Sequence, residues 1–321
     1  MNITNEIRAN AKLIDAKIIL PEADLDERVM QACEYILANG LAKLVVFGEE
    51  KQFKNSIVNN ANCEIINIDN CKYFDEFANQ LYELRKHKGL TLEESKQLIK
   101  NPAYFAMMML KNNMADGVVA GAKFTTADTL HPALQIIKTK PGKNTVVGSI
   151  IMAKEGCNPL IFADVSLIEK PNVETLAEIA VSAAEFMEKV LKEQPKVAML
   201  SYSTKGSANS EMVDAVKQAT EIAKQSGYLI DGEMQVDSAL DKATAQKKGI
   251  ISQVGGNANV LVFPDLNAGN IGYKLVARLG GYTAIGPIML NFNKPVNDLS
   301  RGCTAQEIVD TVCITKLQIE Q

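Results

Sequence analysis

Short apolar segments of strand length alternate with amphipathic segments of helix length along the chain, and this alternation is the strongest constraint on its fold. A first strand is expected at residues 17–20, a helix over 24–39 ends at Gly40, and a second strand follows at 43–47. Strands joined through a helix run parallel, so this first unit predicts a βαβ arrangement with a parallel pair.

The same alternation continues over the rest of the sequence. Further strands are expected at 63–68, 117–120, 145–152, 160–165, 196–201, 228–230, 259–263 and 283–289. Helices are expected at 73–86, 92–100, 102–113, 175–192, 210–224, 236–247, 270–279 and 304–316, and Thr91 with Glu94 has the pattern of a capping box. This spacing favours an α/β fold with open sheets covered on both faces, not a sandwich or a barrel.

Length and composition set the outer limits. A chain of 321 residues predicts about two domains, and 47% apolar with 22% charged residues is typical of a globular protein. No apolar run approaches the roughly 20 residues of a membrane-spanning helix, and the polar start does not resemble a signal peptide, so a cytoplasmic location is expected. The six cysteines are scattered, which favours reduced thiols, and the net charge of −4 gives no case for nucleic-acid binding.

Several kinds of catalytic site lack their signatures in this sequence. There is no GxxxxGK[ST] phosphate loop, no GxGxxG at a helix start and no GxSxG elbow. The two histidines, His87 and His131, have no metal-site spacing, and Cys303 has no obvious histidine partner. The remaining possibility is chemistry carried out by positioning and charge.

Four polar loops follow predicted strands, where ligands bind in open α/β sheets. The loop 121–129 opens a helix, and its amides with the hydroxyls of Thr125, Thr126 and Thr129 would suit a phosphate, although taken alone the loop is better explained by simple N-capping through Thr125 or Thr126. The loop 201–207, which contains Lys205, is either an anion cradle or a solvated turn. The other two loops are 231–237 and 263–274.

Five motifs in order resemble those of phosphate acetyltransferases, and the resemblance runs from Leu20 to Thr315. The motifs are TTADTLxPALQIIKTKPG from residue 125, AMLSYSTKGSA from 198, DGEMQVDSA from 231, FPDLNAGNIGYK from 263 and PVNDLSRG from 295. The resemblance implies two αβα domains similar to the isocitrate and isopropylmalate dehydrogenase fold, with the active site in the cleft between them. The implied domains are 1–145 with 295–321, and 146–294.

The resemblance also implies a reaction and partners. Acetyl-CoA and phosphate would give acetyl phosphate and CoA by direct transfer in a ternary complex. No metal and no cofactor beyond the substrate coenzyme A is implied, and the family members are usually homodimers.

Residue roles follow from the same resemblance. Arg301 would neutralise phosphate and the charge that grows on the carbonyl oxygen, and Ser300 would donate a hydrogen bond to that oxygen. Glu307 stands where the family has an aspartate that takes the thiol proton, but Thr304 and Glu307 also form a capping-box pattern, so Asp298 is a second candidate for the general base.

The remaining assignments concern substrate binding. Arg85 matches an arginine that helps to hold coenzyme A, and Thr125, Thr126, Thr129 and Asn297 are assigned to substrate or coenzyme A through their motifs. His131 replaces an arginine of the family pattern, which puts coenzyme A affinity and acyl preference in question because a histidine cannot reproduce a guanidinium fork. Val165 replaces a frequent cysteine.

Three alternative readings stay open. Propionyl or butyryl transfer is the nearest, because the sequence does not fix acyl-chain length. A decarboxylating dehydrogenase would share the architecture but needs metal-binding aspartates and a nucleotide site that the sequence does not present. A non-catalytic regulatory module is disfavoured by the presence of Ser300 and Arg301.

Overall fold

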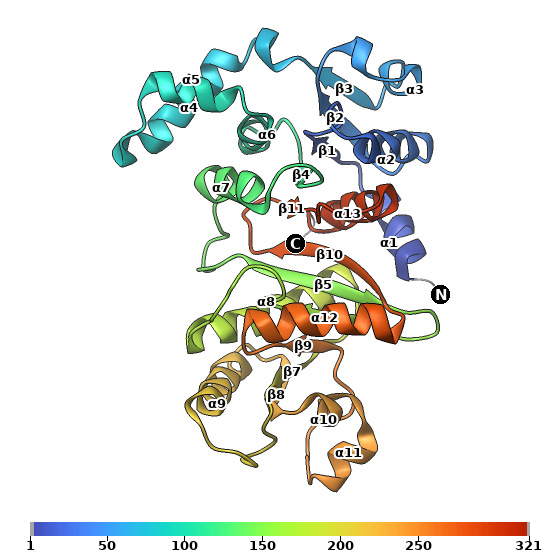
Figure 1. Cartoon of the computed structure of the whole chain (residues 1–321), viewed down its shortest axis with the longest axis vertical. Coiled ribbons are helices and arrows are strands. Elements are labelled where there is room, and N and C mark those ends of the chain that lie inside the picture. Colours follow the sequence, from blue (N-terminus) through green and yellow to red (C-terminus); the bar gives the residue numbers. More distant parts are fainter. Residues whose placement is uncertain (1–2, 320–321) are drawn as a thin grey trace. The chain divides into compact units, whose positions relative to one another are not determined.

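The computed structural model of the chain describes residues 3–319 (Figure 1). The chain divides into two compact units, each of which has its own sheet. The terminal unit comprises Thr4–Pro141 with the described residues from Phe292 on, and the central unit comprises Gly142–Asn291. Two crossings of the chain therefore connect the units.

The sheet of the terminal unit has five strands in the order β11-β4-β1-β2-β3, and all of its neighbouring pairs are parallel. The strands are β1 (Lys17–Leu20), β2 (Lys43–Phe47), β3 (Cys63–Ile66), β4 (Gly117–Ala120) and β11 (Val296–Asp298). From β1 the chain adds β2 and β3 on one side and later β4 and β11 on the other. The strand order therefore reverses between β1 and β4, the place where open α/β sheets bind ligands.

Helices cover both faces of this sheet. Figure 1 shows α6 and α7 on one side of it and α2 and α13 on the other. The helices of the unit are α1 (Ile3–Lys12), α2 (Glu27–Ala38), α3 (Asn55–Val58), α4 (Phe74–Arg85), α5 (Leu92–Ile99), α6 (Pro102–Lys111), α7 (Thr126–Ile136) and α13 (Ala305–Leu317). Short 3-10 turns lie at Glu50–Gln52, Ile68–Asn70 and Lys86–Lys88. The edge-to-face rings of Phe47, Phe77 and Phe105 fill the core between β2, α4 and α6.

The central unit has a six-stranded sheet in the order β10-β5-β6-β9-β7-β8. Its strands are β5 (Val147–Ala153), β6 (Leu160–Ala163), β7 (Lys196–Leu200), β8 (Leu229–Met234), β9 (Val260–Val262) and β10 (Thr283–Leu290). The four strands from β6 to β8 are parallel, whereas β5 runs antiparallel to both β10 and β6. The alternation of strands and helices did not reveal this antiparallel edge, because short loops and helical crossovers both fit between apolar runs.

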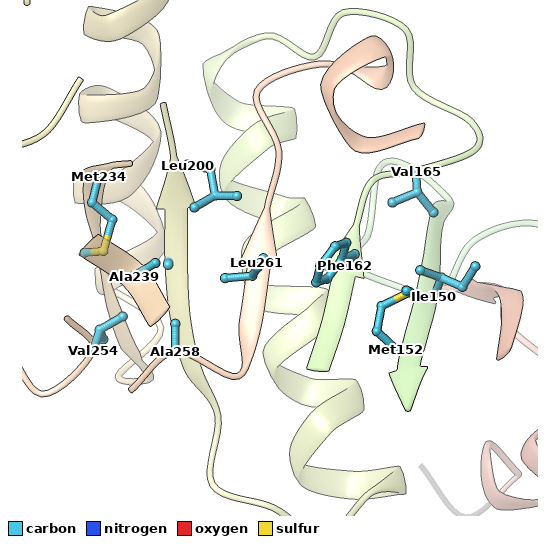
Figure 2. Close-up of a cluster of buried hydrophobic side chains, with 11 residues drawn as sticks. Ile150, Met152, Phe162, Val165, Leu200, Met234, Ala239, Val254, Ala258 and Leu261 are labelled. Atoms are coloured by element: carbon cyan, nitrogen blue, oxygen red, sulfur yellow. The ribbon is translucent and has the colours of Figure 1, made fainter. Parts of the chain in front are cut away.

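Five helices pack on the central sheet: α8 (Val173–Val190), α9 (Glu211–Lys224), α10 (Val236–Leu240), α11 (Lys242–Lys247) and α12 (Leu266–Gly280). Figure 2 shows part of the buried core, with Phe162 of β6 and Leu261 of β9 between Ile150 and Leu200. The helix expected over 236–247 is broken into α10 and α11, because Asp241 adopts extended backbone and caps α11 through its side chain.

The α/β class predicted from the sequence is confirmed in both units. Within residues 3–319, no helix is long and apolar enough to span a membrane.

Candidate active site

The carboxyl ends of β1, β4 and β11 lie together in the terminal unit, because these three strands are parallel neighbours. Glu22 follows β1, the turn 121–125 leads from β4 into α7, and residues 299–304 lead from β11 into α13. Thr125, Ser300 and Arg301 fall on these connections. Asn297, Asp298, Thr126, Thr129 and Glu307 lie on the adjoining ends of β11, α7 and α13.

The turn after β4 closes around the carboxylate of Glu22, which is 1% exposed. One carboxylate oxygen accepts the N–H groups of Gly121 (2.7 Å) and Ala122 (3.1 Å), and the other accepts those of Lys123 (2.7 Å) and Phe124 (2.6 Å). The amides that the sequence offered as a phosphate cradle are therefore already occupied by a side chain of the same unit.

Thr125 caps α7, as its alternative interpretation proposed. The Thr125 hydroxyl accepts the N–H of Asp128 (3.1 Å) and donates to the Asp128 carboxylate (2.7 Å), which in turn accepts the N–H of Thr125 (3.0 Å). Thr126 is the exposed first residue of the helix, and Thr129 is fully buried one turn later.

Asp298 ends β11 and is 2% exposed. Its Oδ1 atom and the hydroxyl of Thr129 are two buried oxygens with no hydrogen-bond partner among residues 3–319. Burial raises the pKa of Asp298 to about 6, and the nearby charge of Glu22 adds to the rise. The Thr126 and Thr129 hydroxyls lie near the carboxyl without hydrogen-bond geometry among residues 3–319, and their proximity partly offsets the rise. A buried carboxyl that changes its protonation near neutral pH is a candidate general acid or base.

The loop after β11 presents Ser300 and Arg301 to solvent. Within the described part of the chain, the Ser300 hydroxyl accepts the N–H of Gly302 (3.3 Å) and donates to no group, so its proton is available to a ligand. The Arg301 side chain makes no hydrogen bond or ion pair with the residues that the structure describes. Both groups are thus placed to act on an external ligand.

Arg28, in the first turn of α2, fixes the backbone of this loop. Its guanidinium donates to the carbonyl oxygens of Arg301 and Cys303 (2.8 Å each) and of Ala122 (2.8 Å). It also pairs with Asp26, the N-cap of α2, at 2.7 Å. One partly exposed guanidinium therefore ties the loop after β11 to the turn after β4.

Glu307 lies in the first turn of α13 and forms the capping box that its sequence predicted. Its carboxylate accepts the N–H of Thr304 (2.6 Å) and the Thr304 hydroxyl (3.2 Å), while that hydroxyl accepts the N–H of Glu307 (3.2 Å). Close by, burial raises the pKa of the Cys303 thiol to about 11, so this thiol stays protonated at neutral pH.

Arg85 lies on α4 and His131 on α7, and α6 lies beside both of these helices. Arg85 ends α4, and its charge lowers the otherwise raised pKa of Tyr104, a half-buried residue of α6. The Tyr104 hydroxyl donates to Gln135 (3.3 Å), which is one turn after the exposed His131 on α7. His131 and Gln135 are four residues apart and share a face of α7, and Gln135 links this face to Tyr104 of α6.

Asn297 points away from these groups. It is fully buried in β11, and its amide donates to the Thr315 hydroxyl (2.8 Å) and to the Gln318 carbonyl (2.7 Å) near the end of α13. This contact anchors β11 to α13.

The polar loop 201–207 of the central unit is also filled from within. The Glu233 carboxylate accepts the Ser203 hydroxyl and the Gly206 N–H, both at 2.8 Å, and Lys205 pairs with Asp231 at 2.6 Å. Val165, which replaces the frequent cysteine, is fully buried at the end of β6. Across residues 3–319, no group of three or more His, Cys, Asp or Glu side chains is arranged to hold a metal ion.

Glu22 and Arg28 are the two site residues that the sequence analysis did not single out. A carboxylate two residues after a buried strand is one available signal for Glu22. An arginine in the first turn of a helix is the signal for Arg28, because the helix dipole disfavours a cation there unless it has partners elsewhere.

The strand order and this group of residues define an α/β protein with a candidate site at the switch point of a parallel sheet. The chain matches the phosphate acetyl/butaryl transferase family over residues 2–316 and belongs to that family. The resemblance that its five motifs indicated is therefore confirmed.

Individual relatives agree along their whole length. The chain is 46% identical to a phosphate acetyltransferase of Thermoanaerobacterium thermosaccharolyticum, with 100% of both chains covered. It is 45% identical to a phosphate acetyltransferase of Clostridium acetobutylicum, over 100% of this chain and 99% of the relative. The crystal structure of a phosphotransacetylase from Streptococcus pyogenes superimposes with a TM-score of 0.92 at 41% identity, over 99% of this chain and 98% of the other.

Proposed function

We propose that this protein transfers an acetyl group between coenzyme A and phosphate. The observation that carries the proposal is the full-length identity of 46% and 45% to two phosphate acetyltransferases. The exposed Ser300 and Arg301 on the loop after β11, beside the buried carboxyl of Asp298, supply groups that such a transfer needs.

The transfer is a single displacement at the acyl carbon. In the direction from acetyl phosphate, the coenzyme A sulfur forms a bond to the carbonyl carbon while the bond from that carbon to the phosphate oxygen breaks. The thiol proton passes to a carboxylate, and phosphate leaves with the bonding pair. In the reverse direction, a phosphate oxygen attacks acetyl-CoA and the thiolate takes the proton back.

Arg301 and Ser300 act on the negative charge of this reaction. The Arg301 guanidinium pairs with the phosphate and with the charge that grows on the carbonyl oxygen, and the Ser300 hydroxyl donates to the same oxygen. Charge-assisted hydrogen bonds of this kind are worth about 1.5–3 kcal/mol each. Arg28 holds the backbone of this loop at Arg301 and Cys303.

Asp298 and Glu307 are the two candidates for the base that takes the thiol proton. A thiol with a pKa of about 8.5 is mostly protonated at neutral pH, so a nearby base increases the rate. Asp298 is supported by its burial and by a pKa of about 6, which leaves it mainly ionised at neutral pH. Glu307 is supported by its match to the family aspartate, although its carboxylate also caps α13.

Coenzyme A binding is assigned to groups on α4 and α7. Arg85 offers a cation for a phosphate of coenzyme A. His131 lies on the face of α7 that carries Gln135, and Gln135 accepts the hydroxyl of Tyr104, the residue whose pKa the charge of Arg85 lowers. Thr126 and Thr129 contribute hydroxyls near Asp298, and Thr125 acts mainly through the capped helix start. Asn297 contributes by anchoring β11.

We also infer that the protein is a cytoplasmic homodimer that needs no cofactor apart from coenzyme A as substrate. The dimer is supported by an apolar stripe on α12, where Ile271, Leu275 and Leu279 recur every fourth residue and are 57%, 52% and 82% exposed. A second copy of the chain would cover this stripe. Sedimentation of the protein and of Leu279→Glu tests this point, since the substitution should shift the dimer toward the monomer.

Acyl preference is the second open choice. The family description covers acetyl and butyryl transfer, and His131 replaces an arginine of the family pattern, so propionyl or butyryl transfer is the alternative substrate choice. A regulatory module without activity is the remaining alternative.

The experiment is a steady-state assay of coenzyme A release from acetyl-, propionyl- and butyryl-CoA, with and without phosphate. Release that depends strictly on phosphate or arsenate, and is fastest with acetyl-CoA, is expected. Equal release in phosphate-free buffer indicates a hydrolase, and no release with any acyl chain indicates a regulatory protein.

A further inference from the structure

Glu22 links the end of β1 to the turn after β4, across the place where the strand order reverses. Its side chain is almost completely buried and receives four backbone N–H groups at 2.6–3.1 Å. Hydrogen bonds to a carboxylate are stronger than those between neutral groups, and four of them on one side chain fix the turn in a single shape.

This turn packs directly against the buried carboxyl of the site. Gly121 has φ +105°, and a Cβ atom there would lie 2.3 Å from Asp298 Oδ1 and 2.7 Å from the Leu299 nitrogen. Only glycine fits this conformation and this contact. The shape that Glu22 imposes on the turn therefore reaches Asp298 through the backbone of Gly121.

The turn also determines where α7 begins. Its last braced amide belongs to Phe124, and the N-cap Thr125 follows at once. The Thr126 and Thr129 hydroxyls that act on the pKa of Asp298 stand on the first turn of this helix. Displacement of the turn would therefore move these hydroxyls relative to the carboxyl.

We propose that Glu22 is a positioning residue for acyl transfer, which holds the turn after β4 so that Asp298 faces the first-turn hydroxyls of α7 in a fixed, dry geometry. This inference rests on the proposed function. Glu22 touches neither substrate in this scheme and acts through the backbone of the turn. It also excludes phosphate from the turn amides, so a substrate phosphate is directed to the exposed Arg301.

The charged and titratable groups around this carboxyl pair come from each neighbouring connection. Glu22 acts on Asp298 from the end of β1, and its charge raises the Asp298 pKa. The charge of Glu22 also raises the pKa of Arg28 on α2, and Arg28 is paired with Asp26. Cys303 precedes α13 and stays protonated. Removal of the Glu22 charge should thus lower the Asp298 pKa, because the desolvated negative charge beside it is gone.

The first experiment is the substitution Glu22→Ala with chemical rescue. It leaves the four turn amides without an acceptor, and a small carboxylate such as formate can occupy their place. We expect kcat to fall by about 10²-fold and added formate to restore at least tenfold of it, because the anion rebuilds the turn. Asp116→Ala is the matched control, since Asp116 braces the same two strands at their opposite ends through the Lys17 N–H (2.8 Å) and should need no formate.

The second experiment does not depend on turnover. In the isosteric variant Glu22→Gln, the Asp298 carboxyl is titrated by ¹³C NMR and compared with the unsubstituted protein. We expect its pKa to move down toward the ordinary aspartate value. Because this readout needs no substrate, it tests Glu22 even if the assay shows that the protein has no transferase activity, which would refute the proposed function separately.

Three results would overturn the inference. One is a kcat for Glu22→Ala within about threefold of the unsubstituted protein. Another is a combination of three observations: Glu22→Ala folds but stays slow when formate is added, Glu22→Asp is no faster than Glu22→Ala, and the Asp298 pKa in Glu22→Gln equals that of the unsubstituted protein. If both Glu22→Ala and Glu22→Gln fail to fold, Glu22 serves stability alone and has no separate role in the reaction.

Discussion

In both units a buried glutamate accepts backbone N–H groups of a turn that follows a strand, but the two units differ in which neighbouring polar groups have hydrogen-bond partners. In the central unit, Glu233 fills the turn after β7, and Lys205 is paired with Asp231. In the terminal unit, Glu22 fills the turn after β4, yet one buried oxygen each of Asp298 and Thr129 has no hydrogen-bond partner among residues 3–319.

This difference locates the chemistry better than the polar loops alone. Buried polar groups are normally satisfied, so unpaired oxygens close together on a carboxyl and a hydroxyl mark a place that the fold maintains at a cost in stability. The central unit has one such oxygen, the Ser166 hydroxyl after β6, but no buried carboxylate with an unpaired oxygen beside it within the described chain. A turn whose N–H groups are bonded to a buried glutamate has a structural role, whereas a buried carboxyl with an unpaired oxygen is a candidate reactive group.

The sharpest division within the terminal unit is between its two candidate bases. Asp298→Asn and Glu307→Gln each keep the size of the side chain but cannot accept a proton, and the residue that acts as the base should lose about 10²–10⁴-fold in kcat. We expect both variants to fold. Asp298→Asn keeps the size of the buried side chain, and in Glu307→Gln the new residue is accepted at the third position of a capping box. Steady-state kinetics with melting curves measure both effects.

Thr304→Ala is the control for Glu307. It removes the cap at about 1 kcal/mol of stability and should leave kcat nearly unchanged. If Glu307→Gln turns over at the normal rate, Glu307 is only a cap, and Asp298 becomes the first candidate.

Substitutions of Arg301 and Lys205 compare a cation that has no hydrogen-bond or ion-pair partner among the described residues with a cation that has one. Arg301→Ala should lower kcat by about 10²-fold or more without changing the melting temperature, because its side chain is exposed and forms no hydrogen bond or ion pair with the described residues. Lys205→Ala should instead lower the free energy of unfolding by about 1 kcal/mol, since Asp231 loses its closest cation and keeps only the more distant Lys224 (3.9 Å). It should change kcat by less than about tenfold.

Arg301→Lys refines this comparison. It keeps the charge but loses the fork, so an intermediate rate is expected. A normal kcat for Arg301→Ala would remove this residue from the site.

The unpaired carboxyl should also cost stability in a defined pH range. The pKa of Asp298 rises from an ordinary 3.8 to about 6 on folding, so the folded protein binds the proton more tightly and becomes less stable as pH rises through this range. Asp298→Asn stays neutral and should raise the free energy of unfolding by up to about 3 kcal/mol above pH 7, at about 1.36 kcal/mol per pKa unit. Below pH 4 it should give no gain.

Urea denaturation at pH 4 and pH 8 measures this difference. Glu233→Gln is the control from the central unit, because its carboxylate already has hydrogen-bond partners, so this substitution should not stabilise the protein. An Asp298→Asn variant that is equally destabilised at both pH values would contradict the account of Asp298 as an unsatisfied, titrating carboxyl.

The smallest expected effect concerns His131 on α7, one of the residues assigned to coenzyme A binding. His131→Arg should lower the KM for coenzyme A by roughly tenfold at most, because one partly solvated charge-assisted contact is gained. Leu134→Arg, on another exposed position of α7, is the matched control. Weaker binding in His131→Arg would mean that this side chain points away from the ligand.

Local patterns predicted much of the secondary structure. The capping boxes at Thr91 and Thr304 were readable because each is completed within four residues, and both are present. The antiparallel course of β5 and the break at Asp241 were not predicted, since each depends on which strand or helix lies beside the segment.

The sequence alone determined the α/β class, the family and the loop that carries Ser300 and Arg301, because these follow from local periodicity and from contiguous motifs. Tertiary structure alone decided how that loop is held and which carboxyl is unsatisfied. Glu22 meets the Gly121 amide across 99 residues, and Arg28 meets the Arg301 carbonyl across 273. Such contacts exist only after parallel strands have brought their carboxyl ends to one edge, and no local pattern along the chain encodes them.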